Sequence, residues 1–192
     1  MKKHIPNSLT LFRIVLVPFF IWFAFFDLHK HNFLWAAIIF IVASITDYYD
    51  GMLARRLKVV SNFGKIMDPL ADKILITAAL VALAMPRIDL ISWLVVTIII
   101  VREIVVSIFR SYYARKGVFV PANVWGKLKT TLQMTGVISA LVYKALFIQF
   151  TMNVMGYFVT AFNFYFWLVA AVTIISGFSF FGNAKKYKEQ KK

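Results

Sequence analysis

Four aspartates stand close together in the first half of the chain: Asp47, Asp50, Asp68 and Asp72. They are four of only eight acidic residues in the protein. The members of each pair are three or four positions apart, so each pair would share one face of a helix. Carboxylate oxygens are the ligands that Mg²⁺ and Mn²⁺ prefer. The spacing therefore predicts a site for two divalent ions of the kind that enzymes use to displace groups at phosphorus, with magnesium expected and manganese as a substitute.

Small residues and one arginine accompany these aspartates. Gly51 and Ala54 lie on the same helical stripe as the first aspartate pair, at about 100° per residue. Together with Gly64, which precedes the second pair, they would let a bulky ligand approach the backbone. Arg55 would offer a planar donor to a phosphate or a base. The segment is thus suited to holding a phosphorylated ligand beside the metal ions.

A purely structural role is the alternative for the aspartates. Asp68 followed by Pro69 could cap the start of a helix. Asp47 and Asp50 could form ion pairs with Lys73 or with nearby arginines. Carboxylates cost about 2.5–3.5 kcal/mol each at mid-membrane on insertion scales, which disfavours a packing role for all four. Four carboxylates accompanied by small residues at matching helical spacing favour a metal site over a capping or ion-pairing role.

Composition identifies the chain as a membrane protein. Hydrophobic residues form 61% of it, and the mean hydropathy is +0.76. Apolar runs of about 20 residues recur along its length, which predicts an all-α polytopic membrane protein with one membrane domain over residues 1–192. The six expected transmembrane spans, preceded by a short interfacial segment, are 8–28, 33–55, 66–86, 88–114, 127–150 and 153–181. The chain has no cysteine, which excludes disulfide bonds and thiolate–metal chemistry.

The net charge of +14 is distributed unevenly over the expected loops. With six spans, both termini share one side with the connections 52–68 and 114–127, and that side carries most of the lysines and arginines outside the spans. The opposite side carries Lys30, Arg87 and Lys144. The positive-inside rule therefore places the termini and the aspartates on the cytoplasmic side. The basic residues act as topology signals and contacts for anionic lipids, so the charge does not indicate nucleic-acid binding.

The aspartate segment resembles a known family signature. It reads Asp47-x2-Asp50-Gly51-x2-Ala54-Arg55-x8-Gly64-x3-Asp68-x3-Asp72 and resembles that of the CDP-alcohol phosphotransferases at every fixed position. With the six-span layout, the resemblance covers essentially the whole chain. It implies the fold of that family, a homodimer, and a reaction in which an alcohol hydroxyl attacks the β-phosphorus of a CDP-linked donor and releases CMP.

The same resemblance implies a role for each signature residue. Asp47 and Asp68 would bridge the two metal ions, Asp50 would complete one metal site and Asp72 the other. Asp72 would also accept the proton of the attacking hydroxyl. The pocket for the cytidine diphosphate group would be lined by Gly51, Ala54, Arg55, Gly64 and, as a weaker candidate, Ser61.

Three looser motifs indicate the acceptor. They are Ile5-Pro6-Asn7-Ser8-Leu9-Thr10-Leu11-Phe12-Arg13, Arg102-Glu103-x6-Arg110 and Gly126-Lys127-x-Lys129-Thr130-x2-Gln133. They resemble the bacterial branch of the family, which implies the cytoplasmic (inner) membrane as location, CDP-diacylglycerol as donor and glycerol-3-phosphate as acceptor. A phosphorylated acceptor needs cations, and the candidates are Arg13, Arg110, Lys127 and Lys129. Arg102 is instead expected to join Glu103 in an internal ion pair.

Two other functions stay open at this point. A sibling enzyme of the family could accept serine, inositol phosphate or phosphatidylglycerol. A divalent-cation transporter would need carboxylates near mid-membrane on several spans, whereas here they gather at one edge. For assembly, Ala78 and Ala82 have the small-xxx-small spacing that lets helices approach closely, either between two copies or within one.

Overall fold

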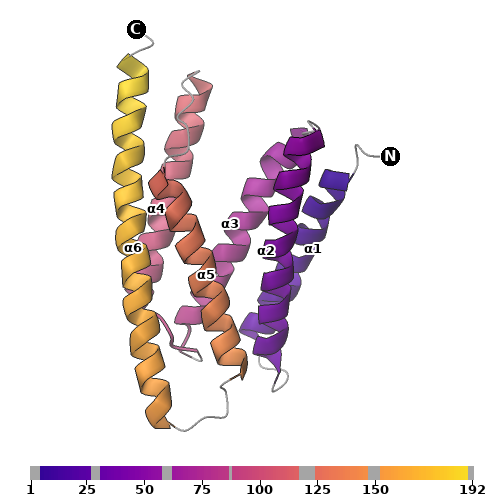
Figure 1. The fold of residues 1–192 in the computed structure, drawn as a ribbon, viewed down its shortest axis with the longest axis vertical. Coiled ribbons are helices and arrows are strands. Elements are labelled where there is room, and N and C mark those ends of the chain that lie inside the picture. The colour runs from indigo at the N-terminus through magenta and orange to yellow at the C-terminus, as the bar shows by residue number, and fades with distance from the viewer. Residues whose placement is uncertain are drawn as a thin grey trace. The chain divides into compact units, whose positions relative to one another are not determined.

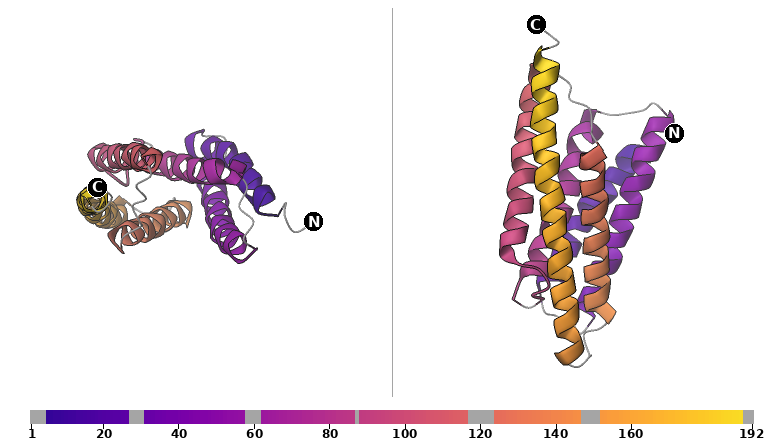
Figure 2. Two further views of the ribbon diagram at one scale, coloured as in Figure 1. Left: turned by 90° about the horizontal axis from the view of Figure 1, so that it is seen from above. Right: turned by 60° about the vertical axis from the view of Figure 1, so that its left-hand side comes forward.

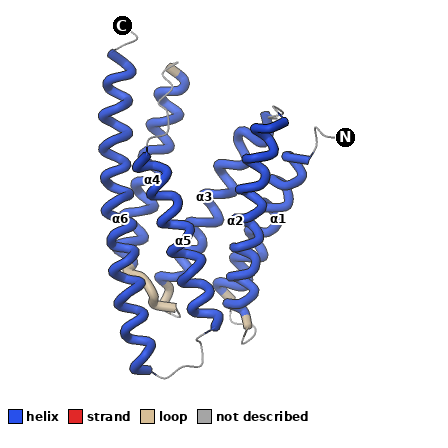
Figure 3. Tube along the Cα trace, viewed as in Figure 1, coloured by secondary structure: helices blue, strands red, loops and turns tan. Residues whose placement is uncertain are grey.

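The computed structural model describes the backbone of residues 5–26, 31–57, 62–86, 88–116, 124–146 and 152–189. Side chains are described for residues 11–26, 31–46, 70–86, 88–116, 124–146, 156–184 and 187. Over these residues the chain is made of helices and turns, without a strand (Figure 1, Figure 3). The helices are α1 (Ile5–Phe25), α2 (Asn32–Leu57), α3 (Asn62–Ala84), α4 (Trp93–Arg115), α5 (Val124–Leu146) and α6 (Met152–Glu189).

Each predicted span overlaps one of these helices, so the all-α class is confirmed over the described residues. The ends differ in places. Residues 5–7 were predicted to belong to a separate interfacial segment, but they are the first residues of α1, which runs unbroken to Phe25. Residues 1–4 lie outside the described part of the chain. At the other end, α6 continues past the predicted limit of 181 to Glu189.

The fourth helix begins later than the predicted residue 88. Ser92 is its N-cap: the Ser92 hydroxyl accepts a hydrogen bond from the Leu94 N–H (3.3 Å), and α4 begins at Trp93. The Ser92 N–H donates to the side-chain oxygen of Asn163 on α6 (3.0 Å). Upstream, Asp89 has a φ of 48°, in the left-handed region, which interrupts any right-handed helix there. The cap satisfies a backbone donor that has no partner within the helix.

The chain forms two compact units. The first comprises Met1–Ile88 and Val137–Phe150, and the second comprises Asp89–Gly136 and Thr151–Lys192. The helix α5 contributes its two halves to different units.

In the first unit, α1 packs against both α2 and α3. Phe20 of α1 and Phe40 of α2 are fully buried, and their ring centroids lie 5.8 Å apart. Alanines with no exposed surface allow the helices to approach closely. These are Ala36 and Ala43 on α2 and Ala79 and Ala82 on α3. Ala79 and Ala82 of α3 are therefore already used in packing within the chain.

In the second unit, α4 packs against α6, and the first half of α5 meets α6 at a glycine. A Cβ atom placed on Gly136 would lie 2.5 Å from Cε1 of Tyr165 and 3.1 Å from Cζ of Phe166. The Tyr165 hydroxyl donates to the backbone oxygen of Leu132 (2.9 Å) and lies 3.0 Å from the hydroxyl of Thr135. The absent side chain at Gly136 thus makes room for the tyrosine that joins the two helices.

One described helix is long and apolar enough to cross a membrane: the segment Gly156–Ala184 of α6, with a mean hydropathy of 1.9. Only 22% of its most apolar stretch is buried within the protein. Shorter apolar helical stretches are Leu11–Phe25 and Asn32–Thr46. Large apolar side chains on α6 face outward, among them Phe164 (74% exposed) and Phe178 (75% exposed). Such a surface suits contact with lipid.

Candidate active site

The two aspartate pairs lie on neighbouring helices of the first unit. Asp47 and Asp50 belong to the second half of α2, and Asp68 and Asp72 to the first half of α3. Both segments are helical, so the members of each pair share a helix face as predicted. Figure 1 and Figure 2 show that α2 ends and α3 begins at the same end of this unit. The fold therefore brings both pairs to that end.

The arrangement of most signature side chains lies outside the described part. This applies to the side chains of Asp47, Asp50, Asp68, Ala54 and Arg55, to the surroundings of Gly51 and Gly64, and to Ser61 altogether. Among the described side chains, no group of three or more acidic or histidine residues could hold a metal ion. The two-metal site stays a prediction, and it depends on the undescribed side chains.

Asp72 is the signature aspartate whose side chain is described. It is partly exposed on α3, between the buried Ala71 and the exposed Lys73. An apolar groove of about 360 Å³ runs along α3, with Lys73 among its lining residues. Its lining residues are Phe25, Leu70, Lys73, Ile74, Thr77, Ala78 and Val81. An amphiphile with an anionic head and an apolar tail would match this combination of one cation and an apolar wall.

The four predicted phosphate-binding residues differ in their surroundings. Arg13, in the first unit, is 1% exposed, and Lys129, in the second, is 6% exposed. Arg110 is exposed on α4, with its guanidinium carbon 5.6 Å from the ring centroid of Phe180. Lys127 is exposed on α5. The structure describes each unit by itself, so the convergence of Arg13 with the other three stays a prediction.

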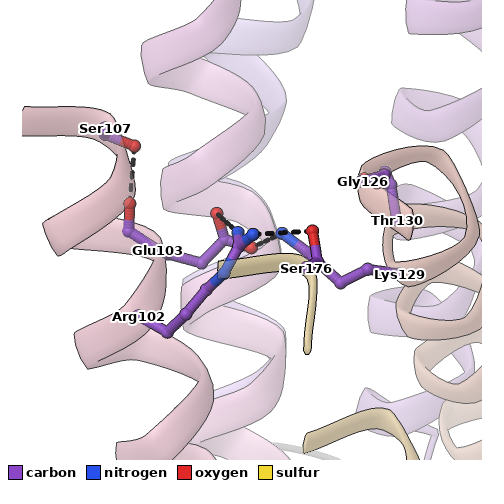
Figure 4. Close-up of polar contacts among 7 residues, drawn as sticks. All are labelled: Arg102, Glu103, Ser107, Gly126, Lys129, Thr130 and Ser176. Carbon is purple, nitrogen blue, oxygen red and sulfur yellow. Dashed lines mark hydrogen bonds and ion pairs between the residues drawn. The ribbon is translucent and has the colours of Figure 1, made fainter. Parts of the chain in front are cut away.

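Arg102, Glu103, Lys129 and Ser176 form a polar cluster in the second unit (Figure 4). The Lys129 ammonium forms an ion pair with one carboxylate oxygen of Glu103. The other oxygen lies 4.0 Å from Nη1 of Arg102. Nη2 of Arg102 donates to the Ser176 hydroxyl at 2.7 Å. The polar cluster therefore joins α4, α5 and α6.

The predicted ion pair between Arg102 and Glu103 is confirmed. Two further contacts of this pair, with Lys129 and with Ser176, were not predicted from the sequence. Lys129 was assigned to an acceptor phosphate, whereas in the structure it pairs with Glu103. Ser176 was not singled out at all. One signal was present: Ser176 and Gly177 are adjacent small residues within a long apolar helix, a combination that admits a large side chain from a neighbour. Their alignment with Arg102 could not be read from α6 alone.

A sequence model of the family described as CDP-alcohol phosphatidyltransferase matches residues 3–175. The chain belongs to this family. The matched residues include all the fixed positions of the aspartate signature, so the predicted family is confirmed.

Curated relatives extend the similarity over nearly the full length. A Bacillus subtilis protein is 37% identical over 191 residues, covering 93% of both chains. A Rickettsia felis protein is 36% identical over 186 residues, covering 96% of this chain and 97% of its own. A Sodalis glossinidius protein is 42% identical over 146 residues, covering 73% and 78%. All three are named CDP-diacylglycerol–glycerol-3-phosphate 3-phosphatidyltransferase.

Proposed function

We propose that this chain transfers the phosphatidyl group of CDP-diacylglycerol to glycerol-3-phosphate, giving phosphatidylglycerophosphate and CMP. The observation that carries the proposal is the near-full-length similarity to relatives named for this reaction. The complete aspartate signature supports it. An acceptor hydroxyl oxygen forms a bond to the β-phosphorus of the donor, the bond from that phosphorus to the CMP oxygen breaks, and the hydroxyl proton leaves. The enzyme belongs to phospholipid biosynthesis.

The signature aspartates fit a pair of Mg²⁺ or Mn²⁺ ions because they offer four carboxylates from two helices of one unit. Asp47, Asp50, Asp68 and Asp72 would hold these ions, with Asp47 and Asp68 shared between them. When bound, the ions neutralise the diphosphate and stabilise the charge that develops at the departing oxygen.

The chain's own groups orient the substrates. Asp72 accepts the proton of the attacking hydroxyl, a general-base role that suits a carboxylate. The cytidine diphosphate group lies against Gly51, Ala54 and Gly64, whose small size would let a bulky ligand approach the backbone, with Arg55 on a phosphate and Ser61 as a further donor. One acyl chain of the donor lies in the groove along α3 that Lys73 helps to line.

The acceptor phosphate is bound by Arg13, Arg110, Lys127 and Lys129. A dianion in a membrane-edge site requires several cations, and a planar guanidinium can bind two of its oxygens at once. Neutral serine would not need such a group of cations. The exposed Arg110 and Lys127 are suited to capturing a water-soluble substrate.

The proposed setting is the bacterial cytoplasmic membrane, with six spans in one membrane domain that assembles as a homodimer. Apolar side chains that face outward on α1 and α6 support contact of both helices with lipid. Both termini and the aspartates lie on the cytoplasmic side, since the loops on that side carry most of the basic residues. The donor's tails then stay in lipid while its nucleotide stays in water.

The test is an acceptor panel with the purified protein. CDP-dioleoylglycerol and Mg²⁺ are supplied with glycerol-3-phosphate, serine, inositol phosphate or phosphatidylglycerol, and CMP release is measured. We expect release with glycerol-3-phosphate and little with the others. Preference for another acceptor would reassign the chain to a sibling activity. Metal flux into proteoliposomes without any CMP release would instead favour a cation transporter.

A further inference from the structure

We infer that Glu103 is a positioning residue for acceptor binding: it holds the ammonium of Lys129 in the place where the acceptor phosphate is bound. The inference rests on the proposed function, because it assigns Lys129 to that phosphate. Glu103 itself does not touch the substrate. Its role was absent from the sequence analysis, which paired it with Arg102 alone.

The polar cluster fixes Glu103 from two sides (Figure 4). Arg102 is anchored on α6 by its 2.7 Å hydrogen bond to Ser176, and a Cβ atom on Gly177 would lie 3.5 Å from its Nε. Arg102 therefore lies closely against α6 and approaches Glu103 from that side. Lys129 reaches the same carboxylate from α5, with 8% of its side chain exposed. The carboxylate is thus held between cations from two helices.

Stability alone gives a poor account of this arrangement. Ion pairs buried in a protein are often no more stabilising than apolar side chains of the same size, because removing charges from water is costly. Ionisable groups within a membrane-embedded bundle are rare and are usually functional. Two cations also share one carboxylate here, so cationic groups outnumber carboxylates within the polar cluster. A phosphate dianion is an anion that such a cluster would attract.

Positioning explains why a lysine would need the carboxylate. Lysine carries its charge on a flexible four-carbon stem, so binding an anion requires ordering that stem. A partner that orders the stem beforehand lowers the cost of binding. Loss of Glu103 should therefore weaken acceptor binding and leave donor binding unchanged. A role in packing alone would lower the thermal stability of the protein without separating the two substrates.

The first experiment compares Glu103→Gln with the control Asp89→Asn. Both remove one negative charge with little change of shape, and Asp89 is an exposed loop residue of the same unit whose φ of 48° asparagine tolerates. We expect Glu103→Gln to raise KM for glycerol-3-phosphate about 10-fold or more, the loss expected when a hydrogen bond between charged groups is removed. KM for CDP-diacylglycerol should stay unchanged, and the control should match the wild type. An unchanged or lowered KM for glycerol-3-phosphate would overturn the inference.

The second experiment tests whether Glu103 acts through Lys129. In a Lys129→Met background, adding Glu103→Gln should cause no further rise in KM for glycerol-3-phosphate. If each substitution instead raises KM for glycerol-3-phosphate independently, so that the two factors multiply in the double variant, the inference is overturned. Should Glu103→Gln not fold, Ser176→Ala removes the anchor of Arg102 and should raise the same KM by a smaller factor. Its control is Thr97→Ala, because the Thr97 hydroxyl donates to the Trp93 oxygen of its own helix.

The wild-type protein separates the two proposals. If it releases no CMP with glycerol-3-phosphate, the proposed function has failed. If it does so and the Glu103→Gln variant matches it in both KM values, the function stands and the inference alone has failed.

Discussion

Replacement of Gly136 by alanine tests whether α5 and α6 pack as described. A new Cβ atom would lie 2.5 Å from Cε1 of Tyr165, closer than real side-chain contacts, and 3.1 Å from Cζ of Phe166. Neither aromatic ring is the free end of a flexible chain, so a ring or a helix must move. Movement of Tyr165 would also weaken its 2.9 Å hydrogen bond to the Leu132 oxygen. The variant should therefore be destabilised, although alanine favours helices.

The size of the destabilisation follows from one stabilising and two destabilising contributions. Alanine in place of glycine in a helix stabilises by about 1 kcal/mol. Overpacking of a filled interface costs about 1–3 kcal/mol, and loss of one buried hydrogen bond costs about 1 kcal/mol. The expected net destabilisation of Gly136→Ala is about 1–3 kcal/mol, from these contributions together.

The assay is thermal unfolding of the purified protein in detergent, with Gly182→Ala as the matched control. No atom lies within 4 Å of a Cβ atom at Gly182, so this variant has only the helix-forming contribution. We expect a lower melting temperature for Gly136→Ala and an equal or higher one for Gly182→Ala. If Gly136→Ala is stabilised as much as the control, the close approach of Tyr165 to Gly136 is wrong.

Four further predictions concern activity. Asp72→Asn should lower kcat for CMP release by about 10²–10⁴-fold, the usual contribution of a general base, while the protein still folds. Removal of divalent metal with a chelator should abolish CMP release, and added Mg²⁺ or Mn²⁺ should restore it. Arg110→Ala should raise KM for glycerol-3-phosphate about 10-fold or more, the loss expected of a hydrogen bond to a charged group; unchanged acceptor kinetics would remove Arg110 from the phosphate site. Ala78→Trp should fill the groove of α3 and raise KM for CDP-diacylglycerol, whereas Trp at the exposed Ala161 of α6 should not; equal effects would exclude the groove as the acyl site.

Local patterns predicted the helices well because they depend on neighbours in sequence. The apolar runs predicted six helical segments, and the spacing of the aspartates predicted that Asp47 would share a helix face with Asp50. The start of α4 was wrong by several residues because non-local contacts decide it. Ser92 caps the helix through the neighbouring Leu94 N–H, but its own N–H bonds to Asn163, 71 positions away, and the sequence does not show that contact.

The candidate site was predictable in its residue types and less so in its pairings. Arg102 and Glu103 are adjacent, so their ion pair could be expected. The ion pair of Glu103 with Lys129 joins α4 to α5, and the bond of Arg102 to Ser176 spans 74 positions. Such contacts depend on the rotation of each helix about its axis. An apolar helix such as α6 gives little indication of that rotation, because apolar residues surround it on all sides.

The alanine spacing on α3 shows how a single motif can be divided between two roles. Ala82 is fully buried in the chain, so it cannot also contact a second copy. Ala78, one turn earlier, lines the groove together with Lys73. A partner helix would need an apolar surface along its whole length, whereas this groove is lined in part by a cation, Lys73, next to Asp72. A lipid with an anionic head and an apolar tail meets both conditions, and a homodimer therefore has to use other surfaces than Ala82.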